Sequence, residues 1–382
     1  MERTKRNNSI IGILFLAFLL LGLIANIAAK DRGFSEKENR VLQERPPISV
    51  ASYFDGRYTA KLETWASDQF VWRDKLISIK TSADLTAGRN ESNGVYYGKE
   101  HYLMEDITVP DEERLERTYT ALQAFREKHP KMKMEFLLAP TSANIYKEKL
   151  PLFLKTADQD DYINAFFTRT AAMDYKSIDV RPAFALQKDH VQLYYKTDHH
   201  WTTDGAFVAY SVFNSAMELK DKTSYEPLVV KNDFRGSLAS KSGFMNGEND
   251  AMSIYLPADS KTYKNSVIVY ADTKEKTTKY YQLDNLDEKD TYTIFGGSNH
   301  PLYTMETPVK GGRRLLVIKD SYANSLVPFL TQRYEMVVVV DPRYFYDDIE
   351  QIIASNKINE VLFLYNANTF FADDSLSMML AP

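Results

Sequence analysis

Three continuous apolar runs in the last third of the chain constrain its fold more than any other feature. They cover residues 314–319, 335–340 and 360–365, and helical patterns over residues 321–332 and 346–355 separate them. Apolar strands that alternate with helices are typical of a parallel sheet that is buried on both faces. We therefore predict an α/β fold in which helices flank a parallel sheet.

The middle of the chain adds further elements to this plan. The spacing of apolar residues predicts helices within residues 53–80, 112–129 and 160–173, a buried strand at 134–139 and a hairpin over 94–104. Residues 225–312 are rich in Tyr, Thr and Val between turn residues, which predicts a β-rich insertion in the α/β domain.

The beginning of the chain differs sharply from the remainder. Residues 9–29 carry no charge, and Arg3, Lys5 and Arg6 precede them. A helix of this length is roughly 30 Å long, enough to cross a bilayer core. The positive-inside rule then keeps residues 1–8 in the cytoplasm. We predict an uncleaved transmembrane signal anchor, and a cleaved signal peptide is the alternative.

The predicted anchor sets the organisation of the rest of the chain. Residues 30–52 are polar and contain Pro46-Pro47, which predicts a juxtamembrane linker. Residues 53–382 then form the extracytoplasmic domain. We therefore expect a single-pass membrane protein whose functional site lies outside the cytoplasm.

Composition narrows the classes of function. A formal net charge of −5 argues against nonspecific nucleic-acid binding. The absence of cysteine excludes disulfides, thiolate zinc sites and cysteine nucleophiles. The chain also holds 25 Tyr and 21 Phe. Aromatic side chains build cores, and exposed Tyr rings stack well on sugar rings, so either role is open for them here.

Polar side chains follow the apolar runs, at the edge where open α/β sheets bind ligands. Ser321 comes soon after the first run and opens a helix, which exposes its hydroxyl and favours a developing oxyanion. A cap formed by Asp320 and Ser321 is the structural alternative. Asn366 and Asn368 are candidate oxyanion donors or turn residues. Arg343 is a candidate partner for a carboxylate or a sugar hydroxyl.

The densest polar cluster is the segment 196–202, KTDHHWT. Asp198 can orient an imidazole, and the histidine can then act as general base for a nucleophile. The structural alternative is a histidine bonded to the backbone, with Asp198 capping a helix that starts near Thr203. Asp198, His199 and His200 are also metal-ligand types, but their spacing offers two ligands with no third nearby, so we expect no metal.

The order of several short motifs resembles the SGNH-hydrolase-like polysaccharide O-acetyltransferases, whose Gram-positive branch is called the DHHW family. The signature is the segment 197–202. The segments 68–74, 98–103 and 138–151 and the block 318–322 resemble further motifs of this family, and Glu38-Asn39-Arg40 with Pro46-Pro47 resembles its post-anchor segment. The resemblance covers most of the chain after residue 29.

The resemblance implies a flavodoxin-like fold of the SGNH-hydrolase type and a role for each residue of the cluster. It implies Ser321 as nucleophile, His200 as base and Asp198 as orienting acid. Tyr322 and His199 join Asn366, Asn368 and Arg343 as possible oxyanion or substrate contacts. The order of Asp and His before Ser matches the alginate-type permutation of this family.

The resemblance also implies a function. Ser321 would accept an acetyl group and pass it to hydroxyls of a cell-surface or secreted polysaccharide. Because acetyl-CoA is cytoplasmic, a membrane-bound O-acyltransferase partner would deliver the acetyl group, and no cofactor is expected. A carbohydrate esterase with the same triad is one alternative, and a non-catalytic glycan-binding or scaffold protein of an exopolysaccharide system is the other.

Overall fold

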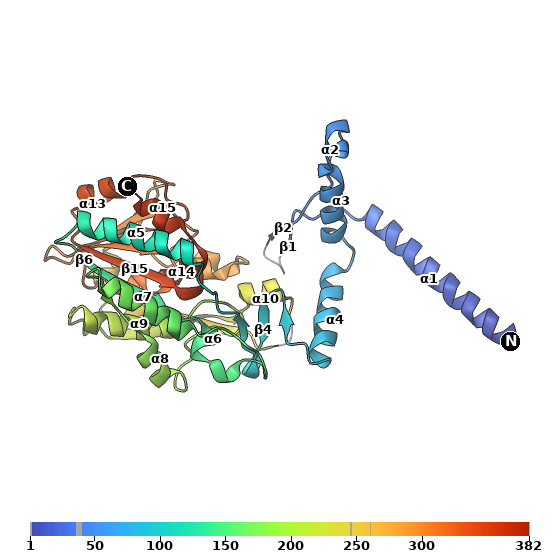
Figure 1. The fold of residues 1–382 in the computed structure, drawn as a ribbon, viewed down its shortest axis with the longest axis horizontal. Coiled ribbons are helices and arrows are strands. Elements are labelled where there is room, and N and C mark those ends of the chain that lie inside the picture. The colour runs from blue at the N-terminus through green and yellow to red at the C-terminus, as the bar shows by residue number, and fades with distance from the viewer. Residues whose placement is uncertain (1, 36–39, 245–246, 260, 382) are drawn as a thin grey trace. The chain divides into compact units, whose positions relative to one another are not determined.

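The computed structural model describes residues 2–35, 40–244, 247–259 and 261–381. The chain separates into two compact units (Figure 1). The first comprises Met1–Ser92 with Gly243–Asn246, and the second comprises Asn93–Ser242 with Gly247–Pro382. The domain boundaries predicted after residues 8, 29 and 52 stay predictions. Of the motif at residues 38–40, Glu38 and Asn39 lie outside the described residues.

The first unit is mainly helical. Its elements are α1 (Glu2–Ala28), β1 (Phe34–Ser35), β2 (Arg40–Val41), α2 (Val50–Phe54), α3 (Arg57–Asp68), α4 (Arg73–Thr86) and β3 (Glu91–Ser92). The helical pattern predicted over residues 53–80 is thus divided among three helices. Residue 56, a glycine with φ of 79°, separates the first two of them.

The predicted membrane anchor falls mostly within α1. None of the helices within the described residues combines the length and the apolarity needed to cross a bilayer.

Two residues of the motif at 68–74 make hydrogen bonds to the backbone of the polar segment at residues 30–52. The amide of Gln69 donates to the carbonyls of Arg32 and Gln43, at 2.9 and 3.0 Å, and its oxygen accepts from the Arg32 N–H at 2.9 Å. The carboxylate of Asp68 accepts from the Gln43 N–H at 2.9 Å. These bonds satisfy backbone groups of a segment with little regular structure, so the motif has a structural role.

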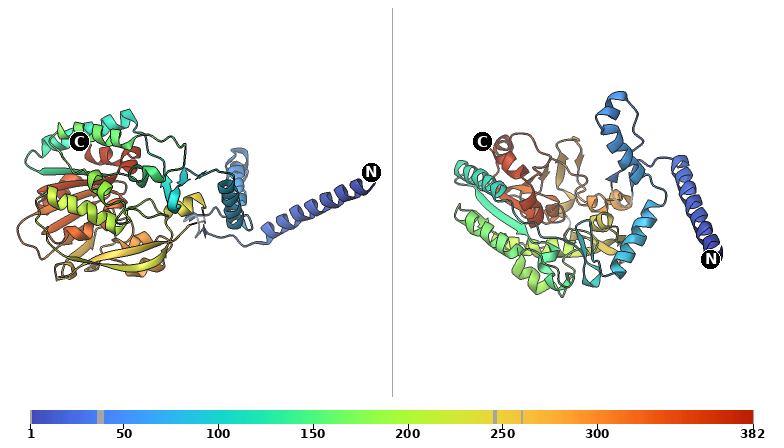
Figure 2. Two further views of the ribbon diagram at one scale, coloured as in Figure 1. Left: turned by 90° about the horizontal axis from the view of Figure 1, so that it is seen from below. Right: turned by 45° about the vertical axis from the view of Figure 1, so that its right-hand side comes forward.

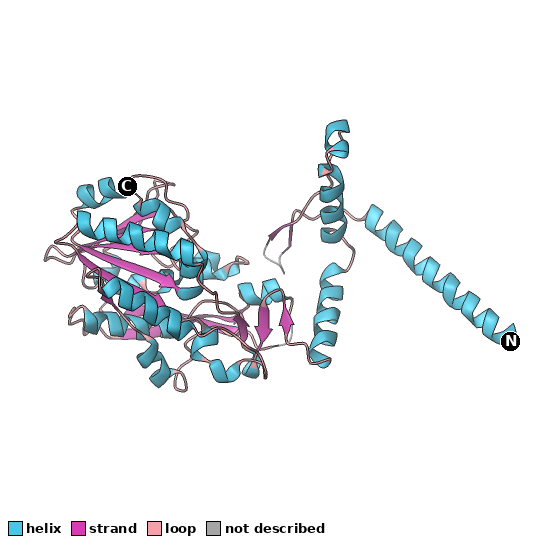
Figure 3. Cartoon of the chain, viewed as in Figure 1, coloured by secondary structure: helices cyan, strands magenta, loops and turns pink. Residues whose placement is uncertain are grey.

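The second unit is built on an eight-stranded mixed sheet (Figure 3). Its strands, in spatial order, are β11 (Lys276–Thr277), β10 (Val267–Tyr270), β12 (Leu302–Glu306), β14 (Met336–Val340), β13 (Arg314–Lys319), β15 (Glu360–Asn366), β6 (Lys133–Ala139) and β7 (Lys176–Ser177). The pairs from β14 to β7 are parallel, and those from β14 to β11 are antiparallel. The predicted α/β fold is confirmed, with a mixed rather than purely parallel sheet.

The segment 225–312 differs from the predicted insertion. Strands β8 (Tyr225–Phe234) and β9 (Asp250–Pro257) form a separate antiparallel hairpin, as an insertion would. However, β10, β11 and β12 extend the main sheet. These strands have short apolar runs interrupted by turn residues, so the sequence did not distinguish a sheet edge from an inserted subdomain. The predicted hairpin near residue 100 is present as β4 (Val95–Tyr97) and β5 (Leu103–Glu105).

Helices cover both faces of the sheet (Figure 2), and a hydrophobic core lies on each face. On one face lie α5 (Glu112–Lys128), α7 (Gln159–Ala171), α13 (Ile349–Asn356), α14 (Ala367–Ala372) and α15 (Ser375–Leu380). On the other lie α8 (Arg181–Gln187), α9 (Thr203–Ala216) and α12 (Val327–Leu330). Because alternate side chains of β13 enter the two cores, its apolar run is buried on both faces.

The helix predicted over residues 321–332 is shorter and tighter than expected. Ser321–Ser325 forms the 3₁₀ helix η5, and one α-turn, α12, follows it. Pro328 lies in the first turn of α12, where a missing N–H is tolerated. The remaining short helices are α6 (Ser142–Ile145), α10 (Ser237–Ser242), α11 (Lys261–Lys264), η1 (Lys99–His101), η2 (Lys147–Lys149), η3 (Leu283–Asp287) and η4 (Thr291–Ile294).

Candidate active site

The carboxyl end of the central strand β13 carries the candidate nucleophile. β13 ends at Lys319, and Asp320 caps the helix η5 by accepting the Tyr322 N–H at 2.9 Å. The other carboxylate oxygen of Asp320 accepts the Asn366 N–H of β15, also at 2.9 Å. The cap expected from Asp320 is therefore present, and it leaves the hydroxyl of Ser321 available for another partner.

The structure brings Ser321, His200 and Asp198 together. Nε2 of His200 lies 2.8 Å from Oγ of Ser321, and Nδ1 of His200 lies 2.6 Å from Oδ1 of Asp198. Both links are within hydrogen-bond distance. The serine and the histidine are 121 residues apart in sequence. This is the arrangement of a serine nucleophile with a histidine base and an orienting acid.

The electrostatics of the pair suit a neutral base. Burial is the largest cause that lowers the pKa of His200 to about 4, and His199 acts in the same direction while Asp198 opposes both. Burial by itself would raise the pKa of Asp198, but the two imidazoles and the Ser237 N–H hold it below its ordinary value. At neutral pH, Asp198 is an anion and His200 is a neutral imidazole that can accept the serine proton.

A buried aspartate shapes the loop that holds this pair. Oδ2 of Asp250, on β9, accepts the main-chain N–H of Thr197 at 2.8 Å and its hydroxyl at 2.6 Å. Oδ1 of Asp250 accepts the N–H of Lys196 and the amide of Gln192, both at 2.8 Å. A single carboxylate thus accepts four hydrogen bonds from the segment just before Asp198. The helix expected near Thr203 is capped by Thr202, not by Asp198.

The backbone at Gly236 and Ser237 encloses the carboxylate of Asp198. The Ser237 N–H donates to Oδ2 of Asp198 at 2.7 Å. A Cβ atom on Gly236 would lie only 2.2 Å from Cβ of Asp198 and 2.3 Å from its Oδ2. Only glycine lets the chain approach this closely. The motifs found in the sequence did not include this support.

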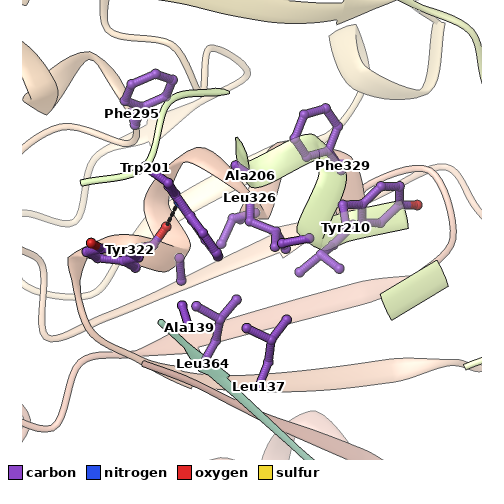
Figure 4. Close-up of a cluster of buried hydrophobic side chains, with 14 of the residues drawn as sticks. Leu137, Ala139, Trp201, Ala206, Tyr210, Phe295, Tyr322, Leu326, Phe329 and Leu364 are labelled. Carbon is purple, nitrogen blue, oxygen red and sulfur yellow. Dashed lines mark hydrogen bonds between the residues drawn. The ribbon is translucent and has the colours of Figure 1, made fainter. Parts of the chain in front are cut away.

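Trp201 and Tyr322 are buried side chains that connect the segment carrying His200 to the segment carrying Ser321 (Figure 4). The indole N–H of Trp201 donates to the carbonyl of Tyr322 and to Oγ of Ser325, both at 2.9 Å. The hydroxyl of Tyr322 donates to the His199 carbonyl. Tyr322 is 1% exposed. Its predicted role as an oxyanion or substrate contact is therefore wrong, because burial removes its ring and hydroxyl from any substrate.

Tyr292 is a site residue that sequence reasoning missed. Its ring stacks on the imidazole of His200, with centroids 3.7 Å apart and planes 8° from parallel. The Tyr292 hydroxyl lies 3.3 Å from Oγ of Ser325. Tyr292 belongs to η4, inside the segment predicted as an insertion, and nothing in the local sequence distinguishes it from the other tyrosines there.

Asn366, the last residue of β15, and Asn368, in α14, have different roles. Asn366 caps α14, with its side-chain oxygen accepting the Asn368 N–H at 2.9 Å. Its Nδ2 is buried and makes no hydrogen bond with a described residue. Nδ2 of Asn368 instead donates to the Asp106 carbonyl at 2.7 Å, and Oδ1 of Asn368 accepts the Thr108 N–H at 3.0 Å. Asn368 as an oxyanion donor stays a prediction, with one N–H of its amide already engaged, whereas Nδ2 of Asn366 has no described partner.

A charged network lies under the same edge of the sheet. Nζ of Lys319 is 3.1 Å from Oδ2 of Asp341, and both side chains are buried. Arg343 binds the same carboxylate through Nε at 2.8 Å and Nη2 at 2.6 Å. Arg343 is a quarter exposed, and its positive charge is one of the smaller causes that lower the pKa of His200.

His199 occupies the exposed side of the cluster. Its Nδ1 lies 2.7 Å from Oγ of Ser237, and its side chain is 34% exposed. Atoms of Asp198, His199 and His200 lie within 4.8 Å of one another, as in a metal site. However, the carboxylate and both nitrogens of His200 are already engaged within the triad, so this set does not fit a resident metal.

Comparisons with known proteins show which families and folds the chain resembles. Residues 95–268 match the family model described as the SGNH hydrolase-like domain of the acetyltransferase AlgX. The resemblance inferred from the motifs is thereby confirmed for this segment. The match includes Asp198 and His200 but ends before Ser321, so the nucleophile rests on the geometry of the site.

Relatives and solved structures extend the comparison. The chain is 25% identical over 180 residues to the "Probable alginate O-acetylase AlgJ" of Pseudomonas fluorescens, and it spans about half of that protein's length (45%). PatB1 of Bacillus cereus, solved with a sulfonyl adduct, shares the fold with a TM-score of 0.61 and 22% identity, over 74% of this chain and 98% of that one. A DHHW family protein from Eubacterium siraeum gives the same TM-score at 23% identity, over 75% and 95%.

Proposed function

We propose that this chain is an O-acetyltransferase that moves an acetyl group, through an acyl-enzyme on Ser321, onto hydroxyls of a cell-surface or secreted polysaccharide. The observation that carries the proposal is the continuous hydrogen-bonded line from Ser321 through His200 to Asp198. The acetyltransferase family model that matches residues 95–268 supports acetyl as the group transferred. The AlgJ relatives support a polysaccharide as its acceptor.

The chemistry proceeds in two half-reactions. Oγ of Ser321 attacks the carbonyl carbon of the donor ester while Nε2 of His200 takes the hydroxyl proton. The tetrahedral intermediate then expels the donor alcohol or thiol, which receives that proton from His200, and acetyl-Ser321 remains. In the second half-reaction, a sugar hydroxyl attacks the carbonyl carbon of acetyl-Ser321 while Nε2 of His200 takes its proton. The intermediate then expels Oγ of Ser321, which receives that proton, and the acetyl group remains on the sugar.

The oxyanion of each intermediate needs donors close to Ser321. The main-chain N–H of Ser321 is one candidate, and the second is Nδ2 of Asn366. Asn366 lies beside the nucleophile because its own N–H is bonded to Asp320, and Nδ2 has no partner among the described residues. A buried donor without a partner costs about 1–3 kcal/mol, and the oxyanion would satisfy it.

The location and the acetyl donor belong to the same proposal. The uncharged run at residues 9–29 after Arg3, Lys5 and Arg6 supports export, and retention of that run would make it the anchor. An exported enzyme has no access to cytoplasmic acetyl-CoA. A membrane-bound O-acyltransferase partner would then supply acetyl groups. Fractionation of cells, with intact-mass measurement of the membrane-bound protein, tests location and retention together.

Two experiments on the full-length protein test the catalytic claim. Methanesulfonyl fluoride should add one sulfonyl group to the wild type and none to the Ser321→Ala variant, as read by intact mass. An acetyl-ester donor with deacetylated polysaccharide should then give acetylated polymer with the wild type alone. Ester hydrolysis without transfer, even at high acceptor concentration, would make the protein an esterase. Unchanged polymer acetylation in cells that carry Ser321→Ala at normal protein levels would exclude catalysis by this site.

A further inference from the structure

We propose that Tyr344 and Tyr346 form a sugar-stacking platform that holds the acceptor polysaccharide beside Ser321. The inference rests on the proposed function, since it names the surface on which that site receives its acceptor. Both tyrosines lie on the loop between β14 and α13, at the carboxyl end of the sheet.

Exposure distinguishes these two rings from the other aromatic side chains of the second unit. Most of its Tyr and Phe side chains are buried in the two cores. Among the described residues of this unit, the large aromatic side chains that are exposed are Phe153 at 99%, Tyr344 at 41% and Tyr346 at 90%. Two of the three therefore occur within three residues of each other. Exposed apolar side chains that gather in one place mark binding surfaces more often than rings scattered singly.

The register of the sheet places this loop at the mouth of the site. β13 and β14 are parallel neighbours in which Ile318 lies opposite Val340. Ser321 and Tyr344 follow those residues by three and four positions, so the two segments leave the sheet side by side. β12 is antiparallel to β14, with Leu302 opposite Val340, which brings Asn299 to the same edge.

A chain of contacts joins the platform to the catalytic strand. Lys319, two residues before the nucleophile, pairs with Asp341, and Asp341 holds Arg343. The guanidinium of Arg343 lies 5.4 Å from the centroid of the Tyr344 ring. The Asn299 amide donates to the Tyr344 hydroxyl at 3.3 Å. Tyr344 is therefore held in place in the absence of any ligand, as preorganised binding surfaces are.

The chemistry of this surface fits a sugar chain. The axial C–H groups of a pyranose form an apolar face that packs on an aromatic ring, while the ring hydroxyls need donors and acceptors at its edge. The amide of Asn299 and the partly exposed guanidinium of Arg343 supply donors, and the exposed carboxylate of Asp347 supplies an acceptor. Two rings two residues apart can hold a polymer at more than one sugar, so that a hydroxyl of one sugar reaches the acyl-enzyme.

The test measures polysaccharide binding separately from acetyl transfer. The probe is the surface polysaccharide of the source cells, chemically deacetylated, and the protein is the full-length Ser321→Ala variant, which cannot turn over. Tyr344→Ala and Tyr346→Ala should each raise the Kd about 3- to 10-fold, and the double variant more. Tyr346→Phe keeps the ring and should bind like its parent. Phe153→Ala removes an equally exposed ring elsewhere and serves as the matched control.

The outcomes separate the platform from the proposed function. If the alanine variants bind the polysaccharide as tightly as Phe153→Ala, the platform is refuted, even where the enzyme with Ser321 intact transfers acetyl groups. If binding falls in the alanine variants but the wild type acetylates no polymer, the platform stands and the transferase function fails. With both in place, the same substitutions should raise the KM for the acceptor by a similar factor.

Discussion

Replacing Gly236 by alanine should disable the site without touching any of its three catalytic side chains. The added Cβ would lie 2.2 Å from Cβ of Asp198 and 2.3 Å from its Oδ2. Carbon atoms in contact are about 3.5–4.0 Å apart, so either the carboxylate or the backbone must move by more than about 1 Å. The backbone has little freedom, since the Gly236 N–H is bonded to Thr197 and its carbonyl to Ser240.

The size of the effect follows from what Asp198 does. A catalytic group displaced by about 1 Å costs about 100-fold in rate. In serine proteases, replacing the aspartate that orients the histidine lowers kcat by about 10⁴-fold. We therefore expect Gly236→Ala to lower kcat/KM for a small acetyl ester by about 10²- to 10⁴-fold, while the protein still folds.

The assay is ester hydrolysis with thermal unfolding as the check on folding. Ser237→Ala is the matched control, because it keeps the main-chain N–H that binds Asp198 and should stay within a few-fold of the wild type. In an Asp198→Ala background the same glycine substitution should cost little more, since the group it displaces is already gone. A folded Gly236→Ala protein with activity within about fivefold of the wild type would refute the reasoning.

Four further outcomes follow from the structure. Hydrolysis should be flat near neutral pH and fall about tenfold per unit below about pH 4, as His200 takes up a proton, which a pH–rate profile on kcat/KM measures. Asn366→Ala should lower kcat about 10²- to 10³-fold while leaving sulfonyl labelling of Ser321 detectable, and equal kcat values would exclude Asn366 as an oxyanion donor. Tyr292→Leu should lower kcat about 2- to 10-fold and Tyr292→Phe should restore it, because only the ring stacks on the imidazole. Burial and the neighbouring Glu360 raise the pKa of Glu135 from 4.5 to about 8, so the stability it contributes is complete below pH 4.5 and is lost as the pH rises through 8. The full loss is about 5 kcal/mol, and urea unfolding at pH 5 and pH 9 should show it in the wild type but not in Glu135→Gln.

Sequence reasoning succeeded where one short segment carries the signal. The runs at 314–319 and 360–365 are apolar apart from charged residues at their ends, and a strand buried on both faces is the structure that such a run favours. Asp198 and His200 were identifiable because an acid two residues from a histidine is a local pattern. Ser321 was identifiable because the strand before it fixes where it lies.

The parts that failed depend on contacts between distant segments. Tyr322 is a polar residue near the site in sequence, but the partner of its hydroxyl, the His199 carbonyl, comes from another part of the chain. Tyr292 and Gly236 contribute a ring face and an absent side chain, and neither has a local signature. The helix after Ser321 was predicted too long because tertiary packing of a buried turn overrides the 3.6-residue pattern.

The separation of Ser321 from His200 by 121 residues makes reactivity a reporter of folding. The base belongs to a loop held by hydrogen bonds to Asp250 of β9, and the nucleophile begins η5, directly after the central strand β13. Closing so long a loop is among the slower events in folding, because the chain loses conformational entropy before the contacts between its ends form. A sulfonyl fluoride that marks Ser321 thus counts the molecules whose tertiary structure is complete, which far-ultraviolet circular dichroism does not do.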